Sequence, residues 1–317
     1  MKVKHWKRFT IAAALMAVVI ALPFVFDTET SYIIYFLFLT FLYIALSQSW
    51  NLIAGYTGQI SLGHHAFFSI GAYVMGLIWT HDVTRTGYYF DPLTMFLSGL
   101  GSAIFAVAIG IPLLSKLRGD YFALGTLGLG EILRVLFIKG GAFTGGAVGL
   151  MLPSRVYTSM MPYYYTGLLL ALLSTAVTYV IVRSRVGLAI RAIREDEMAA
   201  SASGVHVLGY KVFAFSVSAF LAGLCGSLQG YYLFQVSPEG FLNLNWTLHP
   251  ILMCVLGGSG TLVGPVVGAI FLTAVFSLAN IYLPEVHPIF SGALIILVML
   301  FLPDGIVRLK RKREVGG

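Results

Sequence analysis

Charged residues are scarce in this chain. Of its 317 residues only 10% are Asp, Glu, Lys or Arg, whereas an ordinary soluble domain carries about 25%. Hydrophobic residues make up 58%. A transmembrane helix needs roughly 20 mostly apolar residues to cross about 30 Å of hydrocarbon, and such runs follow one another almost end to end. The composition therefore predicts an all-α, polytopic membrane helix bundle and leaves little chain for a soluble domain.

Cysteine is also rare. The two cysteines, Cys225 and Cys254, both lie inside apolar runs, and neither stands near a His or another Cys at a metal-ligand spacing. We interpret both as small core residues and expect no metal site.

The sequence lacks the motifs of an enzyme or an ATPase. It contains no Gly-Lys dipeptide, which excludes a GxxxxGK[ST] phosphate loop, and it contains no HExxH or GxSxG motif. Paired carboxylates at membrane depth are missing as well. We therefore expect no catalytic residue and no cofactor in this chain, so any ATP that drives it is bound by another chain.

The apolar runs predict about ten crossings, some of them broken or short. They are 9–26, 32–54, 64–80, 92–114, 121–138, 162–182, 212–235, 247–258, 261–283 and 287–303. We expect 247–258, which is short, to cross as a broken or tilted helix. The first run could instead be a cleaved signal peptide, but no small-x-small site follows it, so we expect it to be retained.

The basic residues behind the net charge of +7 are distributed as in a membrane protein. Most Lys and Arg residues fall in loops on one side of the ten-span scheme, and the positive-inside rule makes that side cytoplasmic. Both termini are then cytoplasmic. This distribution argues against nucleic acid as a partner and favours a multi-pass protein in contact with membrane lipid.

Glycine and small polar residues cluster in two places, at 51–73 ("NLIAGYTGQISLGHHAFFSIGAY") and at 255–271 ("VLGGSGTLVGPVVGAIF"). Paired Gly-rich breaks in the two halves of a transporter point to the substrate pathway. Equally, small residues let helices approach closely. The candidate pathway residues are Gly55, Thr57, Gly58, Gln59, Ser61, Gly63, His64, Gly257, Gly258, Ser259 and Gly260. We expect His64 and His65 to cap a helix start rather than to relay protons.

Glu131 is the one acidic residue placed well inside a predicted span, and Arg134 lies three residues after it on the same helix face. The pair could belong to the pathway or to the contact with a partner helix. We favour a plainer interpretation, in which the two charges neutralise each other and fix helix packing.

The loop 183–211 contains an amphipathic stretch. Leu188, Ala192, Ala199 and Ala202 recur at near-helical spacing, the pairs Arg191–Glu195 and Arg194–Glu197 have helical offsets, and Gly204 is a plausible terminator. A helix on lipid headgroups favours Trp, Phe or Leu on its apolar face. Because this face is mostly Ala, we expect it to dock on a protein partner.

Several stretches resemble one family. They are "GYTGQISLGH" (55–64), "LRGDYFALGTLGLGEILR" (117–134), "TGGAVGL" (144–150), "RVGLAIRAIREDEMAA" (185–200) and "AFSVSAFLAGLCGSLQGYY" (214–232). Together they are similar to the branched-chain amino acid ABC transporter permeases of the LivM type. His65 departs from that pattern, because a small residue is expected there.

The resemblance implies a permease domain over 1–317 in a bacterial inner membrane. It implies an importer in which two homologous permease chains enclose one path, two ATP-binding subunits dock from the cytoplasm, and a periplasmic or extracellular binding protein delivers the substrate. It also implies a coupling helix at 185–201, within the coupling loop 183–211. The candidate coupling residues are Arg185, Gly187, Arg191, Arg194, Glu195, Glu197, Ala200 and Gly204.

Alternative functions stay open at this point. Related permeases of similar pattern carry urea or short amides, and the motifs do not indicate which side chain the substrate has. An ion-coupled secondary carrier is a further alternative, although the expected set of intramembrane acids is missing. A membrane enzyme or scaffold fits less well, because catalytic constellations are missing and a docking helix is present.

Overall fold

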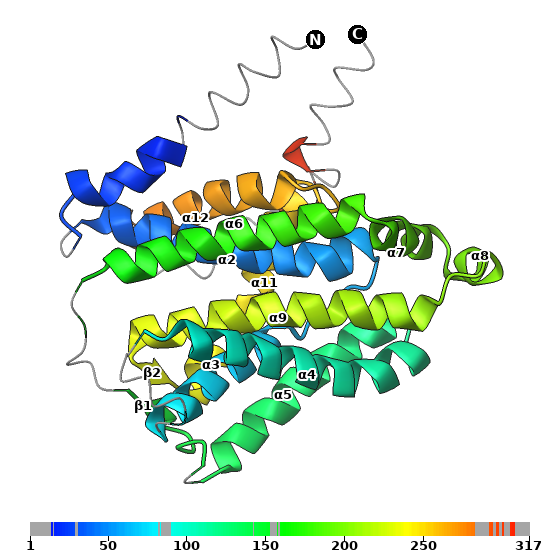
Figure 1. The fold of residues 1–317 in the computed structure, drawn as a ribbon, viewed down its shortest axis with the longest axis horizontal. Helices are drawn as coiled ribbons and strands as arrows, with labels where there is room; N and C mark the ends of the chain where they lie inside the picture. Colours follow the sequence, from blue (N-terminus) through cyan, green and yellow to red (C-terminus); the bar gives the residue numbers. More distant parts are fainter. Residues whose placement is uncertain are drawn as a thin grey trace.

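The computed structural model describes residues 14, 16–28, 31–81, 83, 90–141, 143–152, 157, 159–282, 292–293, 296–297, 300 and 305–307. Long helices running side by side make up most of this part of the chain (Figure 1). The prediction of a polytopic helical membrane protein is confirmed in this respect.

The described helices fall on the predicted apolar runs, except two in the loop 183–211 and one at 238–241. They are α2 (Tyr32–Trp50), continued by the π-helix η1 (Asn51–Tyr56), α3 (His64–Thr80), α4 (Pro92–Lys116), α5 (Asp120–Lys139), α6 (Met161–Arg183), α7 (Arg185–Glu195), α8 (Glu197–Ala202), α9 (Val207–Leu233), α10 (Pro238–Phe241), α11 (Asn245–Gly257) and α12 (Gly264–Tyr282). A shorter apolar helix, Met16–Val25, precedes them.

Six of the described helices are long and apolar enough to cross a membrane, counting α2 and η1 as one. The helices α3 and α11 match predicted spans but have 17 and 13 residues. The structure describes 14 and 16–26 of the predicted run 9–26, but only 292–293, 296–297 and 300 of the predicted run 287–303. The count of ten crossings therefore stays a prediction.

Helix α9 lies at the centre of the bundle, between α3 and α4 on one side and α2 and α6 on the other (Figure 1). Glycine makes this close packing feasible. A Cβ atom on Gly226 would lie 1.8 Å from the Phe68 carbonyl oxygen of α3, and one on Gly223 would lie 2.3 Å from Ser102 Oγ of α4. Small residues at these points let the helix backbones touch. Cys225, beside them, is buried and unpaired, as predicted for a core residue.

The two ends of the bundle differ. At one end β1 (Leu150–Met151) pairs antiparallel with β2 (Gln235–Val236), in the register Leu150 with Val236. This contact ties the loop after α5 to the end of α9. At the other end α6 passes into α7 and α8, which project beyond the long helices (Figure 1). The predicted outside and inside loops thus lie at opposite ends.

The predicted amphipathic helix of the inside loop is two helices rather than one. Asp196 has extended backbone angles, and its carboxylate caps α8 by accepting hydrogen bonds from the backbone N–H groups of Met198 and Ala199. Gly204 then ends α8 in the left-handed region, with φ of +85°. The backbone bonds Val205 N to Ala200 O and Gly204 N to Ser201 O complete a Schellman motif. The prediction of Gly204 as terminator is confirmed.

Candidate functional site

The first glycine-rich segment lies at the end of a span rather than within one. Helical backbone continues through α2 and η1 to Tyr56, and residues 57–63 then turn into α3. Contacts with α7 and α8 place this turn at the end of the bundle where those two helices project. The π-helical turn is a rare geometry that recurs at functional sites. The break therefore lies between the predicted spans 32–54 and 64–80.

The structure brings the two glycine-rich segments together. Asn51 Oδ1 accepts a hydrogen bond from Gly260 N at 2.8 Å, and Asn51 Nδ2 donates to Thr261 O at 2.9 Å. Gln48 Nε2 donates to Leu262 O at 2.6 Å. A Cβ atom on Gly55 would lie 2.7 Å from Gly260 N, so a side chain at residue 55 would force the segments apart. We refer to the contact between 55–63 and 257–264 as the glycine junction.

The polar candidates in the first segment are buried and hydrogen-bonded. Ser61 O accepts from Trp50 Nε1 at 2.9 Å, and Thr57 Oγ1 donates to Leu52 O at 2.9 Å. Each therefore fixes the turn against α2 or η1. The sequence motif thus encodes a packed junction within this chain.

The histidine pair ties the segment to three further helices. His64 Nε2 lies 2.9 Å from Ser49 Oγ of α2 and 3.2 Å from Ser218 Oγ of α9. Thr247 Oγ1 of α11 accepts from the His65 backbone N–H at 2.8 Å and lies 2.9 Å from His65 Nδ1. Both rings are buried. They hold helices together, whereas the sequence suggested only a cap.

In the second segment glycine is required by the backbone. Gly258 and Gly260 have φ of +119° and +74°, a region that side chains other than glycine rarely adopt. A Cβ atom on Gly257 would lie 1.7 Å from Gly264 O, and Ser259 lies part-exposed on the turn between them. In the first segment the same close approach holds for Gly63, whose Cβ would lie 2.3 Å from Thr126 O of α5.

The predicted coupling residue Arg194 contacts the glycine junction directly. Its Nη1 donates to Gly55 O at 2.5 Å. Gly58, with φ of +76°, lies against the aliphatic part of the same side chain. A Cβ atom added to Gly58 would lie 3.0 Å from Arg194 Cγ. The last turn of α7 is thus fastened to the end of η1.

Glu197, the first residue of α8, is the centre of a second connection. Its Oε1 accepts from Gln59 Nε2 at 3.0 Å and from Lys211 Nζ, while its Oε2 lies 3.8 Å from Arg118 Nε. The Lys211 side chain is only 2% exposed. A buried ammonium group needs a partner that offsets its lost hydration, and Glu197 is that partner.

The remaining coupling candidates shape α7 and α8. The predicted helical pairs Arg191–Glu195 and Arg194–Glu197 do not form: Arg191 donates to Gly187 O at 3.0 Å and Val182 O at 3.2 Å, and Arg194 turns to the junction. Gly187 is required because a Cβ there would lie 2.3 Å from Val182 O.

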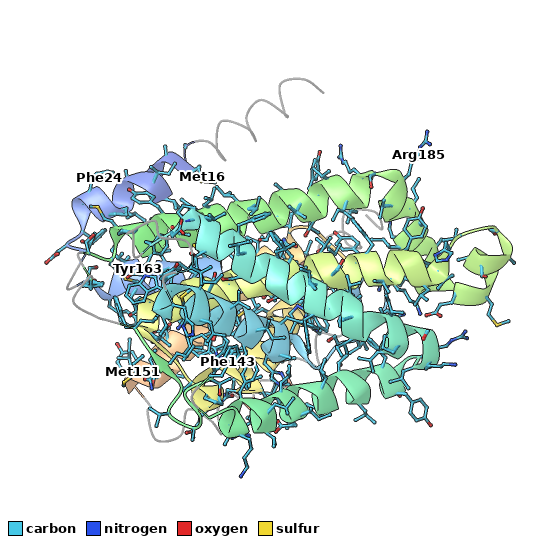
Figure 2. The ribbon with its side chains drawn as sticks, turned by 60° about the horizontal axis from the view of Figure 1, so that its bottom comes forward. Met16, Phe24, Phe143, Met151, Tyr163 and Arg185 are labelled. Atoms are coloured by element: carbon cyan, nitrogen blue, oxygen red, sulfur yellow. The ribbon has the colours of Figure 1, made fainter. Side chains whose placement is uncertain are left out.

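Other candidates of this loop differ in exposure. Ala200 is buried, while Arg185 and Glu195 are exposed. Figure 2 shows Arg185 at the α7 end of the bundle, directed away from the other helices. The exposed side of α7 and α8 includes Leu188, Ala192, Ala199 and Ala202, the face on which we expected docking.

The sequence analysis missed several residues of the site. Asn51, Gln48 and Lys211 join the elements. Asn51 and Gln48 are polar residues within an apolar run, which was the available signal, and Lys211 is a charged residue directly before one. It also missed a cavity of 190 Å³ between α2, α11 and α12, where Tyr43 Oη lies 3.1 Å from His249 Nδ1. Among the described residues no three His, Cys, Asp or Glu side chains are grouped to hold a metal ion.

Glu131 and Arg134 of α5 do form an ion pair, with 3.7 Å between Glu131 Oε2 and Arg134 Nη1. Their side chains are 53% and 43% exposed, respectively. The pair thus points away from the packed helices of this chain. The predicted pairing of the two charges is therefore confirmed, and their role in helix packing stays a prediction.

These features define a class: a multi-pass helical membrane protein in which two short helices at one end are fastened to a small-residue junction. The family described as "Branched-chain amino acid transport system / permease component" matches residues 32–299. The chain belongs to this family of transport permeases, whose members are membrane components of transport systems rather than enzymes.

Individual relatives agree with this assignment. The permease protein LivM of the high-affinity branched-chain amino acid transport system of Escherichia coli is 30% identical, over 94% of this chain and 74% of the relative. The LivH permease of Salmonella typhimurium is 28% identical, over 86% of this chain and 96% of that relative. A probable LivM protein of Methanocaldococcus jannaschii is 22% identical, over 84% of this chain and 90% of that relative. No solved structure matches the chain.

Proposed function

We propose that this chain is one of two homologous permease subunits of an ATP-driven importer for branched-chain amino acids in a bacterial inner membrane. ATP is hydrolysed by separate subunits, and a binding protein delivers the substrate from outside. The observation that supports this most directly is the double fastening of α7 and α8 to the glycine junction, through Arg194 and Glu197. A docking element is thereby bonded to the ends of the spans.

The exposed side of α7 and α8 is the proposed docking surface for the ATPase subunits. Its exposed apolar side chains are Ala192, Ala199 and Ala202 together with the larger Leu188 and Met198, which are 64% and 74% exposed, respectively. Small side chains let a partner approach the helix backbone closely. Two larger apolar residues supply area that a complementary groove can bury.

Movement of the docking element would pass to the spans through specific bonds. Displacing α7 shifts Arg194 and with it Gly55, the last part of η1. Asn51 links η1 to Gly260, so the second glycine-rich segment follows the first. We propose that ATP-driven motion of the partners thus opens and closes the inner mouth of the path, and that the candidate pathway residues form this gate.

The proposed orientation places this end in the cytoplasm together with both termini. In support, Gly305 near the C-terminus lies against Gly258, since a Cβ on Gly305 would be 2.4 Å from Gly258 Cα. Residue 305 is therefore at the same end of the bundle as α7 and α8. Ten crossings fit this orientation, because they return the chain to the side on which it began.

Separating ATP hydrolysis from uptake tests this proposal. In the complete complex, Arg194→Gln combined with Gln59→Ala removes both polar links between the docking element and residues 55–59. We expect ATP hydrolysis stimulated by the binding protein to persist, while substrate uptake falls at least tenfold. The matched control is Arg185→Gln, which removes an exposed charge of the same helix. Normal uptake by the double variant in a correctly assembled complex would contradict the coupling route.

A further inference from the structure

An ion pair lies half exposed near the middle of a membrane span. Glu131 and Arg134 occupy one face of α5, and each side chain exposes about half of its surface. At 1.5 Å per residue, Glu131 lies about 16 Å along the axis from Asp120 and about 12 Å from Lys139. The pair is therefore close to mid-depth, on a face that the described helices of this chain leave open.

Lipid is an unsuitable neighbour for this face. Ionisable groups at membrane depth face a bundle interior or a water-filled cavity in nearly all cases, because hydrocarbon solvates charge poorly. A long basic side chain such as Arg134 can extend toward the nearer end of the span. The shorter Glu131 side chain cannot reach water in that way, so its carboxylate requires polar surroundings where it stands.

Space is also available beside the pair. Gly128 lies one turn before Glu131 on the same exposed face, and a Cβ atom built on it meets no atom of the described residues within 4 Å. In Figure 2 α5 runs along the edge of the bundle, away from α2 and α6. A solute can therefore approach the backbone of α5 next to the two charges.

The covered side of α5 is fastened to the glycine junction. Thr126 Oγ1 accepts a hydrogen bond from Leu62 N at 3.0 Å. The His65 ring lies directly beneath Gly130, where an added Cβ would be 2.0 Å from Nε2. Movement of the junction would therefore displace the open face of α5, although the two lie at different depths.

We propose that the open face of α5 at Gly128, Glu131 and Arg134 lines the aqueous path between the two permease chains and contacts a zwitterionic α-amino acid in transit. The Glu131 carboxylate accepts hydrogen bonds from the ammonium group of the solute, and the Arg134 guanidinium group donates to its carboxylate. The inference rests on the proposed function and sharpens it. It gives the two charged groups of the amino acid one partner each on α5, whereas urea and short amides carry no charges for this pair to recognise.

Accessibility to a hydrophilic reagent tests the position of this face. Gly128→Cys and Glu131→Cys, each in the complete complex in vesicles, should react with a small, charged, membrane-impermeant methanethiosulfonate, and transported amino acid should slow the reaction. The native Cys225 and Cys254 are buried and supply little background. Ile104→Cys on α4 and Leu169→Cys on α6 are controls, because both residues are exposed mid-span apolar positions. Labelling of the controls only, or of neither set, would overturn the proposal.

Uptake by charge variants tests the role of the pair. Glu131→Gln and Arg134→Gln should each lower amino acid uptake at least tenfold, with assembly and stimulated ATP hydrolysis retained. The double variant with both changes is decisive. If the charges only neutralise each other, removing both restores uptake, which would overturn the proposal; if they contact the solute, the double variant stays defective.

The two proposals fail differently. If the unaltered complex shows no ATP-dependent uptake of amino acids, the proposed function is wrong. If the unaltered complex transports them and the double Gln variant transports equally well, only the role of α5 is wrong.

Discussion

Helices α9 and α5 have similar apolar character but very different surroundings. In the most apolar stretch of α9, 50% of the residues are buried, and in that of α5 28% of the residues are buried. On α9, Gly223 and Gly226 each touch a neighbouring helix, while Gly128 of α5 touches no neighbouring helix in the part of the chain that the structure describes. Hydropathy thus identifies a span, but the contacts of its glycine and charged residues show whether the chain itself completes the packing around that span.

The charged residues repeat the contrast. Lys211 of α9 is buried and paired with Glu197 inside the chain. Glu131 and Arg134 of α5 form an ion pair with each other and stay about half exposed among the described residues. We infer that α9 belongs to a finished core and that α5 presents an unfinished surface, to be completed by solute, water and a second chain.

Replacing glycine on α9 is expected to give the largest effect on stability. Gly226→Ala places a Cβ where the Phe68 carbonyl oxygen stands, 1.8 Å away, so α3 and α9 must separate. We expect a loss of about 3 kcal/mol in the free energy of unfolding, the upper range for overpacking. Thermal unfolding of the purified complex measures it, and unchanged stability would show that these helices are not in backbone contact.

Removing the partner of the buried lysine is expected to have the next largest effect. Glu197→Gln leaves the Lys211 ammonium group without its counter-charge, at a cost of about 2 kcal/mol. Adding Lys211→Met should recover part of this stability, since an apolar side chain needs no partner there. Glu195→Gln, at an exposed position of the same loop, is the control. A loss that Lys211→Met does not relieve would argue that Glu197 acts through another contact.

A substitution that strains the backbone without a steric clash should reduce stability less. Gly204→Ala forces a side chain into the left-handed region at φ of +85°, where nothing lies within 4 Å of the added Cβ. We expect a local loss of about 1 kcal/mol, detected as faster amide hydrogen exchange in α8. Exchange that speeds up equally in α9 would mean that α8 and α9 unfold together.

The smallest effect is expected at the open glycine of α5. Gly128→Ala meets no neighbour in this chain and gains helix propensity, so stability should stay the same or rise by up to about 1 kcal/mol. The same unfolding assay as for Gly226→Ala compares the two helices directly. A large loss at Gly128 would reveal a tightly packed partner at that point.

Much of the fold could be predicted from the sequence, because apolar runs determine spans by length. Runs such as 64–80 and 92–114 agree with α3 and α4 within about two residues. The break at Asp196 was missed because the apolar and small residues keep their periodicity through it. Only the side-chain cap on α8 distinguishes two helices from one.

The candidate site was predicted in membership but not in arrangement. Gly55 and Gly260 were selected from two separate segments, and their contact depends on Asn51, whose position in an apolar run did not indicate its hydrogen-bond partners. Likewise, helical spacing predicted an ion pair between Arg194 and Glu197. In the structure Glu197 instead contacts Lys211 and Gln59. Long-range packing of this kind cannot be predicted from local spacing.

The source of energy for uptake tests the central claim most directly. Proteoliposomes should contain this chain, its sister permease, the ATPase subunits and the binding protein, and the measured quantity is accumulation of a radiolabelled branched-chain amino acid. Accumulation should require ATP and should vanish when the ATPase subunits are omitted. Sustained uphill accumulation by the two permease chains alone, driven by a sodium or proton gradient, would contradict the account.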